Sequence, residues 1–209
     1  YAEQLLEEIL RIQNHLTSWI QMSRGQIKLH ISSFPLSDIF AIVEGSSQTF
    51  TLKGVKLNVQ PTEVHVKADR ALTLFMVNTL TDNARKFTEA GGTVSLSAEQ
   101  REDYVEVSVA DTGIGLSQQD IQLINDTKVY DPQKIGRPDT EKGFGFGIMN
   151  CRGIIAQLRK TSTRFACCQF GCSAQEGGGT RFWFRLPYVS TILAFLFSLQ
   201  ISATPIDTL

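Results

Sequence analysis

The segment YVEVSVADTGIG, residues 104–115, decides the fold class, because it joins a strand pattern directly to a glycine turn. Valines alternate with polar residues in its first half, which is typical of a strand with one buried face. Asp111 follows the alternation, and Gly113 and Gly115 allow the backbone to turn sharply beside it. The segment therefore predicts a carboxylate held at the end of a strand.

Patterns on both sides of this segment predict further strands and helices. The run 93–98 alternates in the same way and is expected to pair antiparallel with 104–110. Asp69 is a candidate N-cap of a long helix that ends at Phe87. The other expected strands are 26–31, 56–60, 64–67, 164–170 and 180–186. Of these, 56–60 and 64–67 are expected to form a hairpin. The other expected helices are 34–48, 117–124 and 146–158. This order predicts a two-layer α/β sandwich, in which helices cover one face of a mixed, largely antiparallel sheet.

Both ends of the chain carry apolar patterns that lie outside this sandwich. Residues 1–25 hold a helical seam that fits either packing on the chain's own domain or one arm of a dimeric helical bundle. The seam consists of Leu5, Ile9, Ile12, Leu16 and Trp19. The tail 188–209 has an apolar run shorter than the roughly 20 residues of a membrane-spanning helix. It fits a thin membrane span, a docking helix or the start of a further domain. Because the chain opens directly into a helical pattern, we expect a fragment of a longer protein.

Composition excludes some classes of function. The net charge of −1 does not favour a nucleic-acid partner, which usually selects a basic face. The 4 cysteines form no CxxC pair, and no histidine is near them in sequence, so a zinc site is not expected. We expect reduced and mostly buried thiols.

Three blocks carry residues suited to nucleotide chemistry. Asp111 could accept a hydrogen bond from the amine of adenine. Asn83 offers a neutral oxygen to Mg²⁺, and Lys86 lies on nearly the same helix face, where it could meet phosphate charge. A glycine-rich start of a helix offers backbone N–H groups and a positive dipole end to phosphate. Its glycines are Gly143, Gly145 and Gly147. The long polar stretch 125–142 before them is expected to be a lid.

Together these blocks resemble the ATP-binding domain shared by histidine kinases, gyrase, the MutL mismatch-repair proteins and the large heat-shock chaperone. Residues 83–88 are similar to the N box of histidine kinases, residues 111–115 to the G1 box and residues 143–147 to the G2 box. Residues 130–132 resemble the F box, with a tyrosine in place of the usual phenylalanine. Gly179-Thr180 and the following residues resemble the closing strand. The resemblance covers 34–187 and implies ATP and Mg²⁺ as ligands, with Thr180 among the ATP-binding residues.

Within that superfamily, Thr79 favours phosphoryl transfer over hydrolysis. Hydrolytic members carry a glutamate one helical turn before the N-box asparagine, and a threonine hydroxyl cannot act as a general base near neutral pH. Many histidine kinases carry a second asparagine there, and Asn78 is one residue out of that register. The acceptor histidine of the family is expected on a helix outside this chain, because the three histidines present fit structural or surface positions. These are His15, His30 and His65.

The resemblance implies the catalytic domain of a two-component sensor histidine kinase. Residues 1–25 would then be the second helix of the dimerisation and phosphoacceptor hairpin, and the protein would form a homodimer. It would act on a response regulator, from a cytoplasmic domain attached to the inner membrane. Lys134, Arg137 and Lys142 are the lid cations that could reach the γ-phosphate. Two alternatives stay open, namely a degenerate nucleotide-binding interaction module and a hydrolytic ATPase clamp.

Overall fold

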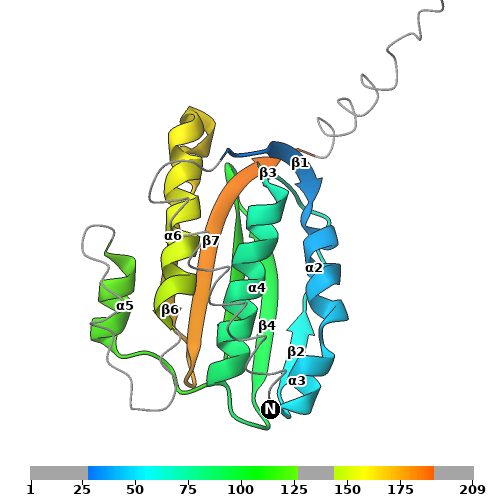
Figure 1. Ribbon diagram of the computed structural model, residues 1–209, viewed down its shortest axis with the longest axis vertical. Coiled ribbons are helices and arrows are strands. Elements are labelled where there is room, and N and C mark those ends of the chain that lie inside the picture. The colour runs from blue at the N-terminus through cyan, green and yellow to red at the C-terminus, as the bar shows by residue number, and fades with distance from the viewer. Residues whose placement is uncertain (1–27, 127–143, 191–209) are drawn as a thin grey trace, which may run out of the picture.

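The computed structural model describes residues 28–126 and 144–190, which form a seven-stranded sheet with helices packed on one face (Figure 1). This arrangement confirms the two-layer α/β sandwich. The helical seam of 1–25, the lid and its cations, Gly143 and the tail beyond Ser190 lie outside the described residues.

The sheet has the strand order β1-β3-β7-β5-β4-β2, and β6 also pairs with β7. Only β2 and β4 pair parallel; the other paired strands within the described residues are antiparallel. The last described strand, β7, is therefore a central one. The strands are β1 Ile31–Pro35, β2 Lys56–Val59, β3 His65–Asp69, β4 Thr93–Gln100, β5 Tyr104–Asp111, β6 Phe170–Ala174 and β7 Thr180–Val189.

Helices α2, α4 and α6 lie side by side across one face of the sheet (Figure 1). Val105, Val107 and Val109 of β5 point into the core beneath them, as the alternation predicts, and each is at most 1% exposed. The described helices are α2 Leu36–Gly45, α3 Gln48–Leu52, α4 Arg70–Phe87, α5 Gln118–Asn125 and α6 Phe144–Thr161, followed by a 3-10 turn at Thr163–Cys167.

Helix α4 begins and ends close to the residues that the sequence predicts. Asp69 caps its first turn, where Oδ1 accepts a hydrogen bond from the Leu72 N–H at 3.1 Å. Its buried residues include Met76 and Leu80 in the middle of the helix, several threonines, and the amide of Asn83 near its C-terminal end. A buried polar residue at this end of a core helix marks a place where chemistry, rather than packing, decides the side chain.

Three predictions of the local structure are wrong. The expected hairpin of 56–60 and 64–67 does not form, because β2 and β3 lie at opposite sides of the sheet and pair with other strands. The expected strand at 164–170 is mostly a 3-10 turn, and β6 begins only at its last residue. The strand expected at 26–31 is displaced, since β1 starts at residue 31.

The helix expected at 34–48 is shorter than predicted. It begins at Leu36, directly after β1, and ends at Gly45, and a separate short helix, α3, begins at Gln48. Ser46 then makes hydrogen bonds from Oγ to the carbonyl groups of Ile42 and Val43, at 3.2 and 2.9 Å. Gly45, the last residue of α2, has a low helix propensity, which favours an end of the helix at this point.

Each of the four cysteines, all within the described residues, is a free thiol. Cys151, Cys168 and Cys172 are buried, as expected, and Cys167 is half-buried.

Among the helices that the structure describes, none has the length and apolar character needed to cross a membrane.

Candidate functional site

The carboxylate of Asp111 is fixed at the end of β5 by two backbone N–H groups. Its Oδ1 accepts hydrogen bonds from the N–H groups of Gly113 at 2.9 Å and Thr180 at 3.3 Å. Asp111 is 5% exposed and Thr180 is 2% exposed. Since β5 and β7 are neighbours in the sheet, the end of one strand meets the start of the other, and the carboxylate is oriented before any ligand arrives.

The glycine turn before β7 allows this arrangement. A Cβ atom on Gly179 would lie 1.8 Å from the Asp111 carbonyl oxygen, and the residue has a φ of +92°. Gly115 also has a positive φ of +73° and faces Gly179 across the turn. Only glycine fits the first of these positions, since both the contact and the backbone conformation exclude a side chain.

The loop after Asp111 rests on the C-terminal end of α4. A Cβ atom on Gly113 would lie 2.1 Å from the Phe87 carbonyl oxygen, and the Ile114 N–H donates to that same oxygen at 3.2 Å. Two sequence blocks separated by the whole of β4 and β5 are therefore joined by backbone contacts.

Asn83 lies on the buried side of α4, facing the first turns of α6. It is 8% exposed, and its Nδ2 has no hydrogen-bond partner among the described residues. A Cβ atom on Gly147 would lie 2.8 Å from Cγ2 of Thr79 and 4.0 Å from Nδ2 of Asn83. A buried amide without a partner is uncommon in folded proteins and fits a site that receives a polar ligand. A half-turn of the amide about its Cβ–Cγ bond would exchange Nδ2 for Oδ1, an oxygen that suits Mg²⁺.

The remaining predicted site residues divide into placed and unplaced ones. Lys86 is half-buried on the last turn of α4, and Asn78 is exposed, so Thr79 and not Asn78 shares the buried side with Asn83. Gly145 lies in the first turn of α6. The structure thus brings together the blocks around Asn83, Asp111, Gly147 and Thr180 by direct contacts. Gly143 and residues 130–132 fall outside the described part of the chain.

One residue beside this site, Lys53, could not be recognised from the sequence. Lys53, in the turn after α3, donates from Nζ to the carbonyl groups of Arg85, at 2.8 Å, and Lys86. Both acceptors are backbone atoms and carry no sequence signal. The only hint was a lysine next to Gly54, at the end of a helix.

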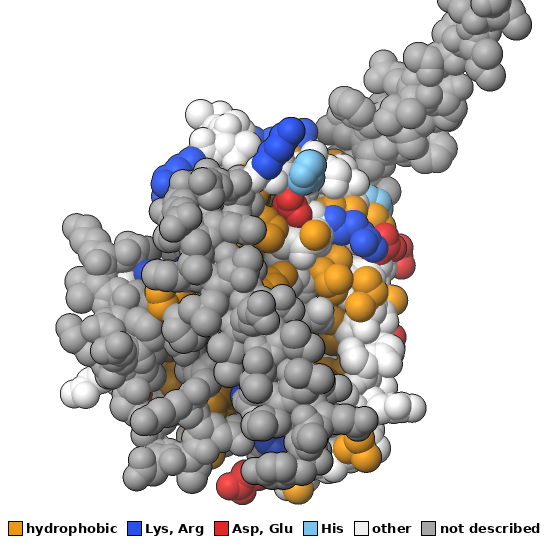
Figure 2. All heavy atoms as spheres, viewed as in Figure 1, with side chains coloured by type: hydrophobic (Ala, Val, Ile, Leu, Met, Phe, Trp, Pro, Cys, Tyr) orange, Lys and Arg blue, Asp and Glu red, His pale blue; other side chains and the backbone are white. Residues whose placement is uncertain are grey.

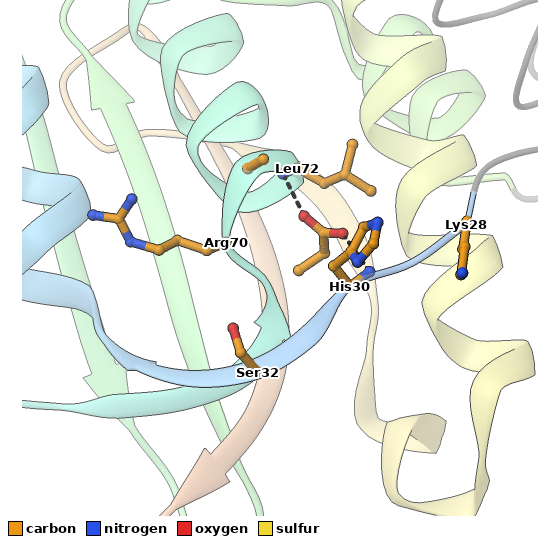
Figure 3. Close-up of a pocket in the computed structure, with 7 residues that line it drawn as sticks. Lys28, His30, Ser32, Arg70 and Leu72 are labelled. Atoms are coloured by element: carbon orange, nitrogen blue, oxygen red, sulfur yellow. Dashed lines mark hydrogen bonds between the residues drawn. The ribbon is translucent and has the colours of Figure 1, made fainter.

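A separate hollow of about 430 Å³ lies where α4 begins (Figure 3). Its lining includes Lys28, His30, Arg70 and Leu72. The Asp69 carboxylate also lines it and accepts hydrogen bonds from the backbone N–H groups of Leu72 and His30. Basic and histidine side chains gather at this end of the molecule (Figure 2). Arg70 and Asn83 are about 20 Å apart along the helix axis at 1.5 Å per residue, so this hollow is distinct from the candidate site.

The fold and these contacts define a nucleotide-binding class of protein. The chain belongs to the family described as histidine kinase-, DNA gyrase B- and HSP90-like ATPases, whose model matches residues 68–190, more than half of the chain.

Individual relatives are sensor kinases. The chain is 31% identical over 163 residues to the histidine protein kinase DivJ of Caulobacter vibrioides, a match that covers 78% of this chain and 24% of that protein. It is 31% identical over 185 residues to the adaptive-response sensory kinase SasA of Crocosphaera subtropica, covering 85% of this chain and 45% of that one. The chain thus spans from about a quarter to less than half of these two curated relatives.

Solved structures agree on the fold. Full-length ShkA in complex with AMPPNP superposes with a TM-score of 0.67 at 24% identity, covering 88% of this chain and 36% of that one. Histidine kinase ThkA in complex with the response regulator protein TrrA gives a TM-score of 0.62 at 18% identity, covering 90% of this chain and 51% of that one.

Proposed function

We propose that this chain is the ATP- and Mg²⁺-binding catalytic domain of a two-component sensor histidine kinase. It would transfer the γ-phosphoryl group of ATP to a histidine on a helix outside the chain. The observation that carries the proposal is the buried Asp111 carboxylate, held by two backbone N–H groups in a loop that rests on α4. The family match and the kinases among the relatives support it.

Each residue has a role that its surroundings suit. Asp111 would accept a hydrogen bond from the adenine amine, with Gly113, Gly115 and Thr180 forming the turn around it. Asn83 would hold Mg²⁺, which neutralises phosphate charge when bound. Lys86 and the N–H groups at the start of α6, from Gly143 to Gly147, would bind the phosphates.

Thr79 supports transfer over hydrolysis. It occupies the position one turn before Asn83, where a hydrolytic enzyme carries a carboxylate to activate water. The residue is 7% exposed, and its methyl group lies against Gly147. A hydroxyl is too weak a base for that step near neutral pH. An acceptor histidine brings its own nucleophile, and positioning plus charge neutralisation then suffice for the reaction.

The full-length protein would work with two kinds of partner. Residues 1–25 would pair with a second copy as part of the dimerisation hairpin. The segment expected at 188–209 begins later than the sequence indicates, because Tyr188 and Val189 belong to β7, and the residues after β7 would serve as a membrane or linker segment. A response regulator would receive the phosphoryl group, and the solved complex of ThkA with TrrA is a precedent for such a pairing. We place the domain in the cytoplasm, with the whole protein attached to the inner membrane.

Calorimetric titration with AMPPNP, in Mg²⁺ and then in EDTA, tests the nucleotide site. Asp111→Asn should weaken binding by about tenfold or more, because an amide nitrogen cannot accept the adenine hydrogen bond while the retained oxygen keeps the turn intact. Asp103→Asn is the matched control, since Asp103 is an exposed carboxylate on the β4–β5 turn. Removing Mg²⁺ should weaken binding to the unaltered chain.

Phosphoryl transfer from labelled ATP to an added acceptor hairpin tests the reaction. Transfer with little ATP hydrolysis by the chain alone is the expected result. Tight nucleotide binding without transfer would favour a non-catalytic interaction module, and rapid hydrolysis would favour an ATPase clamp. Equal affinity of Asp111→Asn and the unaltered chain would make the adenine assignment wrong.

A further inference from the structure

The last turn of α4 ends in backbone carbonyl groups that have no partner within the helix, as in any α-helix. Here each of the last four is used by a group from elsewhere or from the helix end. The donors are Thr88 Oγ1 to Ala84 at 2.7 Å, Lys53 Nζ to Arg85 at 2.8 Å and to Lys86, and the Ile114 N–H to Phe87 at 3.2 Å. Lys53 is the charged member of this set, and it serves two of the four carbonyl groups.

Lys53 is held in place by its own turn. Gly54, which follows it, has a φ of +71° and accepts a hydrogen bond at 2.8 Å from the Gly91 N–H, in the loop after α4. The Lys56 N–H then donates to the Gly92 carbonyl at 2.9 Å. The turn and the loop are thus joined by backbone as well as by the lysine side chain, so the ammonium group reaches α4 from a fixed base.

A cation at this position acts on the helix that carries the phosphate side of the site. The C-terminal end of a helix bears partial negative charge, which an ammonium group stabilises. Lys86 provides one of the bonded carbonyl groups, and Asn83 precedes it by less than one turn. The Asp111 carboxylate, in contrast, accepts hydrogen bonds from the N–H groups of Gly113 and Thr180.

We propose that Lys53 is a positioning residue for nucleotide binding, which sets the orientation of Asn83 and Lys86 through the carbonyl groups of α4. The inference rests on the proposed function and deepens it. Lys53 acts on the Mg²⁺-triphosphate half of the ligand and leaves the adenine half unchanged.

Two titrations, one with AMPPNP in Mg²⁺ and one with adenosine, separate the triphosphate part of the ligand from the adenine part, because adenosine has no phosphate. Lys53→Met should weaken AMPPNP binding by about tenfold, whereas adenosine affinity stays within about twofold of the unaltered chain. Lys53→Arg should restore most of the AMPPNP affinity, because a guanidinium group can still donate to both carbonyl oxygens. Lys56→Met is the matched control, since Lys56 is an exposed lysine on the adjacent strand, and it should change neither affinity.

A general loss of structure in Lys53→Met would weaken the binding of both AMPPNP and adenosine. That result would overturn the role of Lys53, and so would unchanged affinities for both ligands. Lys53→Gln, which keeps an N–H donor and loses the charge, provides the same comparison if the methionine variant does not fold. Failure of the proposed function looks different, because the unaltered chain would then bind neither AMPPNP nor adenosine.

Discussion

At the scale of single residues, the turn before β7 contains three consecutive glycines with positive φ, residues 177–179. A side chain would meet other atoms at only one of the three positions. Gly178 and Gly179 have φ values of +105° and +92°. A Cβ atom on Gly179 would collide with the Asp111 carbonyl oxygen, whereas one on Gly178 would meet nothing within 4 Å. The two positions therefore share a backbone conformation that would strain any residue with a side chain, and they differ in steric contact.

Alanine substitution separates these two effects. Gly178→Ala should cost about 1–2 kcal/mol in the free energy of unfolding, from the left-handed backbone alone. Gly179→Ala should cost about 2 kcal/mol more, because the end of β5 must move. Urea unfolding followed by circular dichroism measures both. Equal losses in the two variants would contradict the contact with Asp111.

The residues of the site that could be predicted are those whose chemistry shows in the side chain. Asp111, Asn83 and the glycines were recognisable because a carboxylate, an amide and a missing Cβ each restrict what can replace them. Lys53 was not, because it binds main-chain oxygen atoms 32 and 33 residues away, which any sequence provides.

At the scale of elements, one carboxylate and two guanidinium groups join β5 to β7 on the sheet face opposite the described helices. Glu106 accepts from Arg181 at 2.6 Å and from Arg185 at 2.9 Å. Arg185 also lies over the rings of Tyr104 and Trp183, 4.6 and 4.7 Å from their centroids. Burial raises the pKa of Glu106, but the hydrogen bonds and charges of the two arginines outweigh it, so the pKa lies below its ordinary value of 4.5.

This lowered pKa predicts how stability changes with pH. A carboxyl whose pKa is lower in the folded state stabilises the fold above its unfolded pKa, and the gain is lost as pH falls through the folded value. Glu106→Gln should therefore lower the free energy of unfolding by about 1–2 kcal/mol at pH 7. The difference from the unaltered chain should shrink below pH 4.5.

Urea unfolding across this pH range measures the effect of Glu106. Glu99→Gln is the control, because Glu99 is the cross-strand neighbour of Glu106 on β4 and pairs with Arg101 at an exposed site, where ion pairs contribute little. An equal and pH-independent loss in both variants would rule out the arginine pairing as the cause.

Elements with a strong local period could be predicted, and so could the antiparallel pairing of β4 with β5 across a short turn. The partners of strands further apart in the chain could not. Helix α4 and strands β4 and β5 follow from capping and alternation, which depend on neighbouring residues. The parallel pairing of β2 with β4 depends on a crossover through β3 and α4, and alternation in 56–60 is the same whichever strand lies beside it. The strand predicted at 164–170 is wrong for a related reason. Short apolar runs do not distinguish helix from strand, and most of this one forms the 3-10 turn at Thr163–Cys167.

At the scale of the whole molecule, the thiols report how tightly the two layers pack. Burial raises the pKa of Cys168 and Cys172 to about 12 and that of Cys151 further, so these thiols stay protonated and shielded near neutral pH. Burial also raises the pKa of Cys167, which is the half-buried one.

Iodoacetamide at pH 8 should therefore modify Cys167 first in the folded protein. The other three cysteines should react only when urea unfolds it, because a protonated and buried thiol is a poor nucleophile. Peptide mass spectrometry after timed labelling measures this order, and the Cys167→Ser chain should take up almost no label while folded. Early modification of Cys172 would mean that the layers open without global unfolding.

The position of β7 has a consequence for how a ribosome produces this protein. β1 and β3 form one part of the sheet and β2, β4 and β5 another, and the strand that joins them, Thr180–Val189, is the last described strand of the chain. A nascent chain that has emerged only to Gly179 exposes the pairing edges of both parts, which are open to unwanted partners. Premature termination just before this strand should thus yield an aggregating product, whereas a stop shortly after it leaves all the described strands in the chain.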